Sequence, residues 1–310
     1  MKVNTRLLLL TTLCIPVLAF GQTKNPESKP QDLSTRGEPP MLGIHWARGF
    51  DPFARAHEAH GHGGGSSALM TYHGGNIMPA AVTENIFWGA SWVTNPGDKI
   101  SGLDLWYTGF SNSNYAKTSD EYTGTNGQVG SSTTHMGFVV DASQSAGGGS
   151  TAAILAEVCK VVTNPDPSGN GFYSVYSDTP RGRANYCAYH SSGSCGGKPV
   201  QFAFFFKLDG DAGCDPQDTS GLHSQGLAAL ANVSGHELSE ARTDPASPGA
   251  WYDSSGAENG DKCAWTFNVP LVTFSNGTQW KIQGEWSNAA YSAGTGYPNS
   301  SGQRGCLDGH

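Results

Sequence analysis

Six cysteines in the second half of the chain constrain its fold more than any other feature of the sequence. They are Cys159, Cys187, Cys195, Cys214, Cys263 and Cys306. The number is even and no CxxC pair occurs, which favours three structural disulfides over a cysteine-based zinc site in a chain that enters an oxidising compartment. Proximity favours only one pairing, Cys187 with Cys195, and the sequence leaves the other connections open.

The amino terminus has the pattern of a secretory signal peptide. Lys2 and Arg6 provide a positive flank, and an almost wholly apolar run, residues 7–20, ends in small residues suited to cleavage. This pattern predicts a signal peptide over residues 1–21. Cys14 lies inside the apolar run, so we expect it to be discarded with that segment, and a lipid anchor at this cysteine is the lesser alternative.

Export would carry the chain into an extracellular space or a periplasm, where disulfides persist. There, a disulfide is a better role for Cys187 than that of a catalytic thiol with His190 as its base. No later segment of the sequence is long and apolar enough to form a transmembrane helix, so we expect no integral membrane segment.

The composition indicates one loop-rich domain and excludes nucleic acid as a partner. The chain has 310 residues, of which 42 are glycine, and its formal net charge is -8 with no basic run. That charge gives no electrostatic basis for binding nucleic acid. Residues 22–67 are polar and contain prolines, with His57, His60 and His62 set among glycines. We expect residues 22–67 to be a flexible leader, although a histidine-rich tract can hold metal, and residues 68–310 to form the globular domain.

Helix and strand patterns alternate along this domain. Residues 68–93 suit two strands, because β-branched and aromatic residues are interrupted by a Gly-Gly turn and a proline. Residues 100–115 suit a helix or a strand, whereas apolar residues at helical spacing predict a helix over residues 151–162. Two apolar runs, residues 171–177 and 200–208, predict buried strands. The mixture predicts an α+β fold with a mixed β-sheet.

One further helix carries the most informative polar residues. Apolar residues at helical spacing after Gly221 predict a helix that ends near Asp244. His236 and Glu240 are four residues apart, so they would share one face of this helix, with Glu237 beside them. In the HExxH pattern two histidines so placed hold zinc, but here a glutamate replaces the second histidine. The HExxE string alone is weak evidence, because such pairs are frequent on solvated helices.

An acidic element, Glu258-Asn259-Gly260-Asp261, follows this helix. Its glutamate lies 18 positions beyond Glu240, which suits a third metal ligand. We therefore expect His236, Glu240 and Glu258 to bind a divalent metal, with Glu237 as the general base and Asp261 orienting a ligand. Zn²⁺ is favoured, and Ca²⁺ or Mn²⁺ is possible because oxygen ligands suit harder metals.

Several distinctive blocks occur in order along residues 68–306. They are LMTYHGGNIM and VTENIFWG near the front, YSVYSD and the stretch from Cys187 to Cys214 in the middle, and VSGHELSEARTDP, AWYD and ENGDKCAW near the end. In their order, and in their tryptophan and cysteine positions, these blocks resemble the phosphate-induced or EXORDIUM-like family of secreted proteins. The resemblance implies an extracellular protein without a settled biochemical activity. A zincin-like fold around the HExxE helix is an analogy only.

Two classes of function remain open. The first is a secreted metal-dependent hydrolase that acts on peptides or proteins. The second is a non-catalytic protein that binds cell-wall carbohydrate through aromatic side chains of the last third, namely Trp251, Tyr252, Trp265, Trp280, Trp286, Tyr291 and Tyr297. A serine hydrolase is disfavoured because no GxSxG elbow occurs, and no phosphate-binding loop is present. The sequence does not predict the oligomeric state.

Overall fold

The computed structural model describes residues 38–53 and 68–310, which all belong to one compact unit spanning residues 32–310. The predicted signal peptide, residues 1–21, lies outside the described residues, as do His57, His60 and His62 of the predicted leader.

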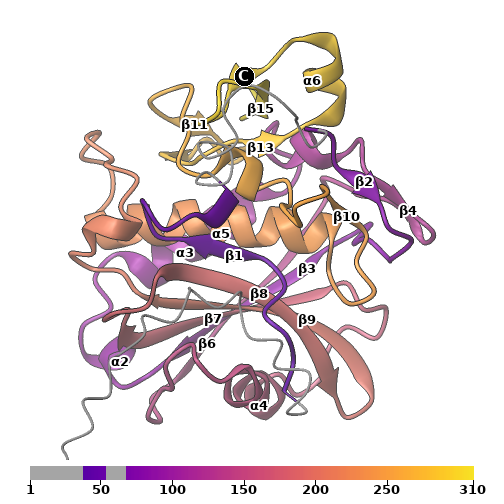
Figure 1. Ribbon diagram of the computed structural model, residues 1–310. Helices are drawn as coiled ribbons and strands as arrows, with labels where there is room; N and C mark the ends of the chain where they lie inside the picture. The colour runs from indigo at the N-terminus through magenta and orange to yellow at the C-terminus, as the bar shows by residue number, and fades with distance from the viewer. Residues whose placement is uncertain (1–37, 54–67) are drawn as a thin grey trace, which may run out of the picture. The chain divides into compact units, whose positions relative to one another are not determined.

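A six-stranded mixed sheet forms the centre of the described unit (Figure 1). Its strand order is β1-β8-β9-β7-β3-β6. Strands β6, β3, β7 and β9 pair in parallel, whereas β8 pairs antiparallel with β9, and β1 antiparallel with β8. The bounds are Ile44–Trp46 for β1, Val82–Trp88 for β3, Thr134–Asp141 for β6, Gly171–Pro180 for β7, Tyr186–Cys195 for β8 and Lys198–Lys207 for β9.

Helices cover both faces of this sheet. α4 packs against β7, β8 and β9 on one face, and α3 and α5 lie on the other (Figure 1). Five helices lie wholly within the described residues: α2 (Ser91–Thr94), α3 (Lys99–Phe110), α4 (Thr151–Val161), α5 (Gln225–Thr243) and α6 (Asn288–Ala293). None of these helices combines the length and the apolar character needed to cross a membrane.

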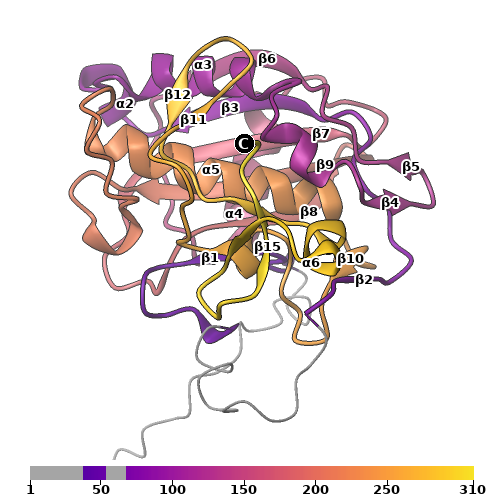
Figure 2. The same cartoon turned by 90° about the horizontal axis from the view of Figure 1, so that it is seen from above.

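Helix α5 lies between the sheet and the carboxy-terminal segment, which covers its opposite side (Figures 1 and 2). Its first turn is capped by Ser224, whose hydroxyl accepts a hydrogen bond from Leu227 N at 3.2 Å. It ends at Thr243, two residues before Pro245, because a proline disfavours helix in the residue that precedes it. Every residue from Gly226 to Thr243 is buried, the polar ones included.

Short strands and turns make up the layer over α5 and its surroundings. They are paired as β2 (Thr71–Tyr72) with β10 (Trp251–Tyr252), β4 (Thr123–Gly124) with β5 (Gly127–Gln128), β11 (Val272–Thr273) with β12 (Gln279–Trp280), and β15 (Arg304–Leu307) with both β13 (Glu285–Trp286) and β14 (Tyr297–Pro298). Three 3-10 helices lie at Ala116–Ser119, Ala212–Cys214 and Asp261–Cys263.

The predicted α+β class and mixed sheet are confirmed, and a zincin-like relationship stays a prediction. The helix predicted over residues 151–162 is α4, the predicted strand at 171–177 lies within β7, and the one predicted at 200–208 matches β9 except for its last residue. Residues 100–115, which suited either state, contain most of α3. Residues 68–93 contain one long strand, β3, and the two-residue β2, rather than two comparable strands.

Three disulfides are confirmed, but the pairing favoured from sequence is wrong. Cys159 pairs with Cys195, Cys187 with Cys214, and Cys263 with Cys306. Cys187 and Cys195 both belong to β8, where their side chains cannot meet. Eight residues of extended strand span roughly 26 Å, whereas bridged cysteines need Cα atoms about 5.5 Å apart.

The predicted boundary at residue 68 is also wrong for part of the leader. Residues 44–46 form β1, an edge strand of the central sheet, and Ile44, His45 and Ala47 are buried. The composition concealed this strand because it is only three residues long and follows two prolines. The adjacent Arg48 is also held, since its guanidinium donates to Asp215 O at 3.0 and 3.1 Å.

Candidate functional site

The candidate site is formed by side chains from three elements: a strand of the central sheet, the helix that packs on it and a later segment. Helix α5 supplies His236, Glu237 and Glu240, strand β8 supplies His190, and the segment after β10 supplies Glu258 and Asp261. All six side chains are buried, and the four from α5 and β8 have no exposed surface. Their burial makes every unsatisfied polar atom among them costly.

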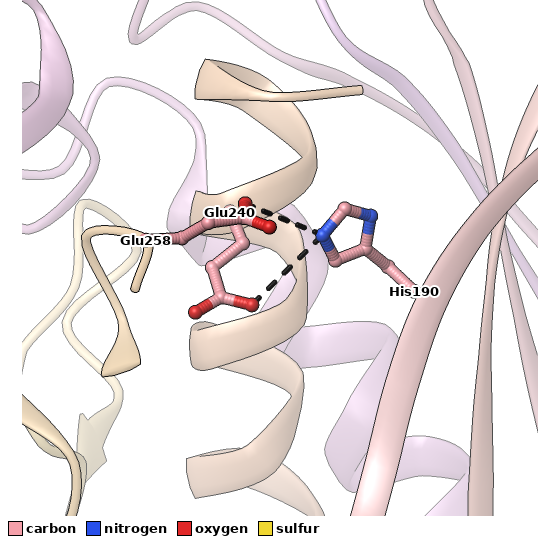
Figure 3. Close-up of side chains that lie close together, drawn as sticks. All are labelled: His190, Glu240 and Glu258. Atoms are coloured by element: carbon pink, nitrogen blue, oxygen red, sulfur yellow. Dashed lines mark ion pairs between the residues drawn. The ribbon is translucent and has the colours of Figure 1, made fainter. Parts of the chain in front are cut away.

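The first cluster joins His190, Glu240 and Glu258 (Figure 3). His190 Nε2 lies 3.4 Å from Glu258 Oε2 and 3.9 Å from Glu240 Oε2. Within the described residues, each of these three atoms lacks a hydrogen-bond partner. Three atoms that could each bind a metal, and that make no hydrogen bond, therefore face one another in the interior, which is the arrangement expected around a bound cation.

A second cluster shares Glu240 and adds His236 and Asp261. His236 Nε2 lies 3.0 Å from Glu240 Oε1, within ion-pair range although not aligned as a regular hydrogen bond, and 3.8 Å from Asp261 Oδ1. Asp261 N donates to the same Oε1 at 3.0 Å. One oxygen of Glu240 is thus held by the second cluster, and the other, Oε2, faces His190.

Gln283 distinguishes the two histidines. Its amide oxygen accepts from Trp265 N at 3.3 Å, and its amide nitrogen donates to Gly260 O at 2.9 Å, so the orientation of the amide is determined. The same nitrogen donates to His236 Nδ1 at 3.1 Å. A neutral His236 then carries its proton on Nε2, which faces Glu240 Oε1 and has no lone pair to offer a metal. His190 has no hydrogen-bond partner at either ring nitrogen within the described residues.

Glu237 lies beside the first cluster, between α5 and the edge of the sheet. Its Oε1 accepts a hydrogen bond from His45 N of β1 at 3.2 Å. Its Oε2 has no partner among the described residues. Glu237 therefore keeps one oxygen available for proton transfer.

Burial dominates the acid–base properties of these groups. It raises the pKa of Glu237, Glu258 and Asp261 well above the usual range, and neighbouring carboxylates add to the effect. Burial raises the pKa of Glu240 to about 7 and lowers the pKa of His190 to about 4. A divalent cation would favour the ionised carboxylates and the neutral imidazole that ligation requires.

Lys262, in the segment that carries Glu258 and Asp261, does not neutralise the carboxylates of the two clusters. Lys262 follows Asp261 directly, but its Nζ is paired with Asp253 Oδ2 at 2.7 Å. The basic side chains that face the carboxylates of the two clusters are thus His190 and His236.

Two glycines leave room for the donor atoms. A Cβ on Gly43 would lie 2.1 Å from Glu240 Oε2 and 2.5 Å from His190 Nε2. A Cβ on Gly260 would lie 2.8 Å from His236 Nδ1 and 3.0 Å from Glu240 Oε1. Since these contacts are too short for any larger residue, the backbone closely surrounds both clusters, and the residues present fit a small ion.

The space beside the site is small. A cavity of about 20 Å³ adjoins Asp261 and is also lined by Asp51, Phe53 and Asp253. That volume accommodates about one water molecule. A substrate would reach the donor atoms only if the residues that cover them moved.

The structure brings together only part of the predicted site. Glu240 and Glu258 lie in one cluster, and Asp261 lies beside Glu240, as expected. The predicted ligand His236 does not share a cluster with Glu258, and His190 takes that place. The sequence did not point to His190 as a candidate ligand because it is 46 residues before His236 and no motif links them. The only role that the sequence suggested for His190 was that of base to a thiol catalyst, a role that the Cys187–Cys214 disulfide excludes.

The predicted aromatic platform is not assembled as one surface. Trp280 and Trp286 are fully buried, and the indole nitrogen of Trp265 donates to Trp46 O at 2.9 Å. Of the remaining residues, Trp251 and Tyr252 belong to β10, where their rings pack with Tyr72 and His73 of the β2 segment, and Tyr291 packs against Trp286. Carbohydrate binding stays a prediction that rests on this smaller aromatic group.

No protein-family model matches the chain, and no curated protein or solved structure matches it either. The resemblance to EXORDIUM-like proteins therefore stays a prediction.

Proposed function

We propose that this protein is an exported, divalent-metal-dependent hydrolase of peptides or proteins, with the metal held by His190, Glu240 and Glu258. One observation carries the proposal. Among the described residues, His190 Nε2, Glu240 Oε2 and Glu258 Oε2 are all buried without hydrogen-bond partners, and the imidazole nitrogen faces the two carboxylate oxygens at 3.4 and 3.9 Å. Buried polar atoms are rarely left unsatisfied, so an ion is the simplest occupant of this space.

The donor set indicates which ion is favoured. One imidazole nitrogen and two carboxylate oxygens resemble the His/Glu ligand sets of catalytic zinc sites, which leave a position open for water or substrate. Manganese also accepts these ligands, whereas calcium prefers oxygen alone. We therefore favour Zn²⁺, with Mn²⁺ as the second choice.

The supporting residues would have separate roles. A bound divalent cation supplies Lewis acidity, which polarises a carbonyl group and acidifies water. Glu237 would accept the proton of the attacking water and deliver it to the leaving nitrogen, while the water oxygen bonds to the carbonyl carbon as the C–N bond breaks. His236 would orient Glu240 through its Nε2 proton.

The location is part of the same proposal. The three disulfides of the described residues are consistent with an oxidising environment. Together with the predicted signal peptide, they support a secreted or periplasmic protein, in agreement with the resemblance to EXORDIUM-like proteins.

Metal analysis combined with a cleavage assay tests this function. The purified mature protein should contain about one equivalent of metal, and it should cleave dye-labelled casein in a reaction that a chelator stops. The assay should include protein that has been activated as described in the next section. Metal-free protein would refute the site, and metal-bound protein that never cleaves would limit the ion to a structural role.

A further inference from the structure

Residues 40–47 run along β8, and residues 44–46 of this segment are strand β1 (Figure 1). Leu42 N donates to His190 O at 3.0 Å, and His190 N donates to Gly43 O at 3.1 Å. Further along, Ala47 N donates to Asn185 O at 2.9 Å. The segment is therefore held as an added antiparallel strand, the mode in which many proteins bind extended peptides.

This segment also covers the groups that a hydrolase needs. A Cβ at Gly43 would lie within 2.5 Å of both Glu240 Oε2 and His190 Nε2, so the backbone of this glycine passes over two of the three donor atoms. Two residues later, His45 N donates to Glu237 Oε1 at 3.2 Å, which engages one of the two oxygens of the proposed base. A larger residue at position 43 would therefore displace these ligand atoms, so a small residue is favoured at this point.

If residues 40–47 served only as a structural edge strand, that role would explain their pairing with β8 but not their position over the ligand atoms. An extended peptide that pairs with β8, lies over the ligand atoms and contacts Glu237 is the pose that peptide hydrolysis requires. Helix α5 and strand β8 do not depend on this segment alone, because they also pack against each other and against β9. Substrate and segment would thus compete for one edge.

We propose that the edge of β8 around His190 is the binding site for an extended polypeptide substrate with a small residue beside the metal, and that residues 40–47 occupy this site in the intact chain. This inference rests on the proposed function. It adds a substrate geometry, a preference for glycine or another small residue beside the ligands, and a latent state that ends when the segment leaves β8.

Controlled cleavage of the full-length mature protein tests the proposal. The recognition sequence of a specific protease is inserted between Gly49 and Phe50, in an exposed turn after β1. A matched control carries the same insertion between Thr125 and Asn126, in the exposed turn between β4 and β5. Both proteins are cleaved, diluted and assayed with dye-labelled casein, and their metal content is measured before and after cleavage.

Cleavage after Gly49 should raise the rate of casein hydrolysis roughly tenfold or more, because the segment loses the millimolar effective concentration that its covalent link provides. Cleavage of the control should leave the rate unchanged. A synthetic peptide of residues 38–49 should then inhibit the activated protein, and the same peptide with Gly43→Leu should not. Mass spectrometry of the casein fragments should find small residues beside the cleaved bonds.

The outcomes separate the inference from the proposed function. Two results would overturn the latent state alone. One is an intact chain that cleaves casein as fast as the protein does after the fragment has left. The other is a metal-bound protein that cleaves casein slowly and gains no activity when the fragment leaves. A fragment that stays bound and does not exchange with labelled peptide would overturn the latent state too, since no substrate could then displace it. Absence of metal in both proteins would refute the proposed function instead.

Discussion

His190 Nε2 lies 3.4 Å from Glu258 Oε2, and both side chains point toward Glu240 of α5 (Figure 3). These residues come from a strand, a helix and a loop that are far apart in the sequence. The facing atoms of these side chains are buried and have no hydrogen-bond partner among the described residues. The fold therefore concentrates carboxylates where only a cation or bound protons can stabilise them.

Glu237→Gln tests the base while leaving the ligands intact. The glutamine keeps the size of the side chain and, in the intact chain, can still accept a hydrogen bond from His45 N, but it cannot take a proton from water. Casein cleavage by the activated protein should fall by roughly 10²- to 10⁴-fold, with metal content unchanged. Both are measured on one preparation, and a variant that keeps most of its activity would remove Glu237 from the mechanism.

The sequence predicted the helix that carries the site but not the partners of that helix. Helical spacing and the HExxE string are local signals, and they were enough to predict α5 and to identify Glu237 and Glu240 as candidate site residues. His190 lies in a strand whose pairing with β9 and whose packing on α5 are properties of the whole sheet. No local spacing encodes that contact.

The same limit explains the error about residues 38–53. A three-residue strand that follows two prolines has too little periodicity to be recognised, and its burial depends on distant parts of the chain: β8, α5, and Trp265 and Gln283 of the carboxy-terminal segment. The disulfide error has the opposite origin. Closeness in sequence favoured Cys187 with Cys195, but the strand that contains both cysteines keeps them apart.

The disulfides should differ in their effect on the site. The Cys263–Cys306 bond anchors the segment that carries Glu258 and Asp261, whereas the Cys159–Cys195 bond joins α4 to β8. The two close loops of similar size, with separations of 43 and 36 residues. Loop entropy therefore assigns each bond about 4 kcal/mol of stability.

Replacing both cysteines of either bond with alanine should thus lower the melting temperature by similar amounts. Only the Cys263→Ala, Cys306→Ala protein should bind metal more weakly, because its loop ligand loses its anchor. Titration with Zn²⁺ below the melting transition measures this difference. Equal metal affinity in the two double variants would show that the bond does not support the site.

A pH dependence of stability should arise far from the metal site, at Glu157 of α4. Burial, aided by a hydrogen bond with Asp141, raises the pKa of Glu157 to about 7 from an ordinary value of 4.5. The folded state then holds the proton more tightly than the unfolded state. The stabilisation that Glu157 contributes through this proton is complete below about pH 4.5 and is lost as the pH rises through about 7.

Glu157→Gln removes this titration and keeps the shape of the side chain. The melting temperature of the variant minus that of the wild type should increase between pH 4.5 and 7, since other titrating groups are common to both proteins. Thermal unfolding at several pH values provides the comparison. A difference that stays constant across this range would show that Glu157 does not hold a proton in the folded state.

Metal content of three histidine variants tests the central claim most directly. His190→Ala should lose the metal, because it removes a ligand, while His236→Asn should still bind one equivalent at saturating Zn²⁺ with an affinity lowered roughly 10- to 100-fold. His135→Ala is the matched control, since this histidine is also largely buried and lies 3.1 Å from a carboxylate oxygen of Asp104, outside both clusters. It should bind metal as the wild type does. Stoichiometric metal in His190→Ala, with loss only in His236→Asn, would contradict the ligand set proposed here.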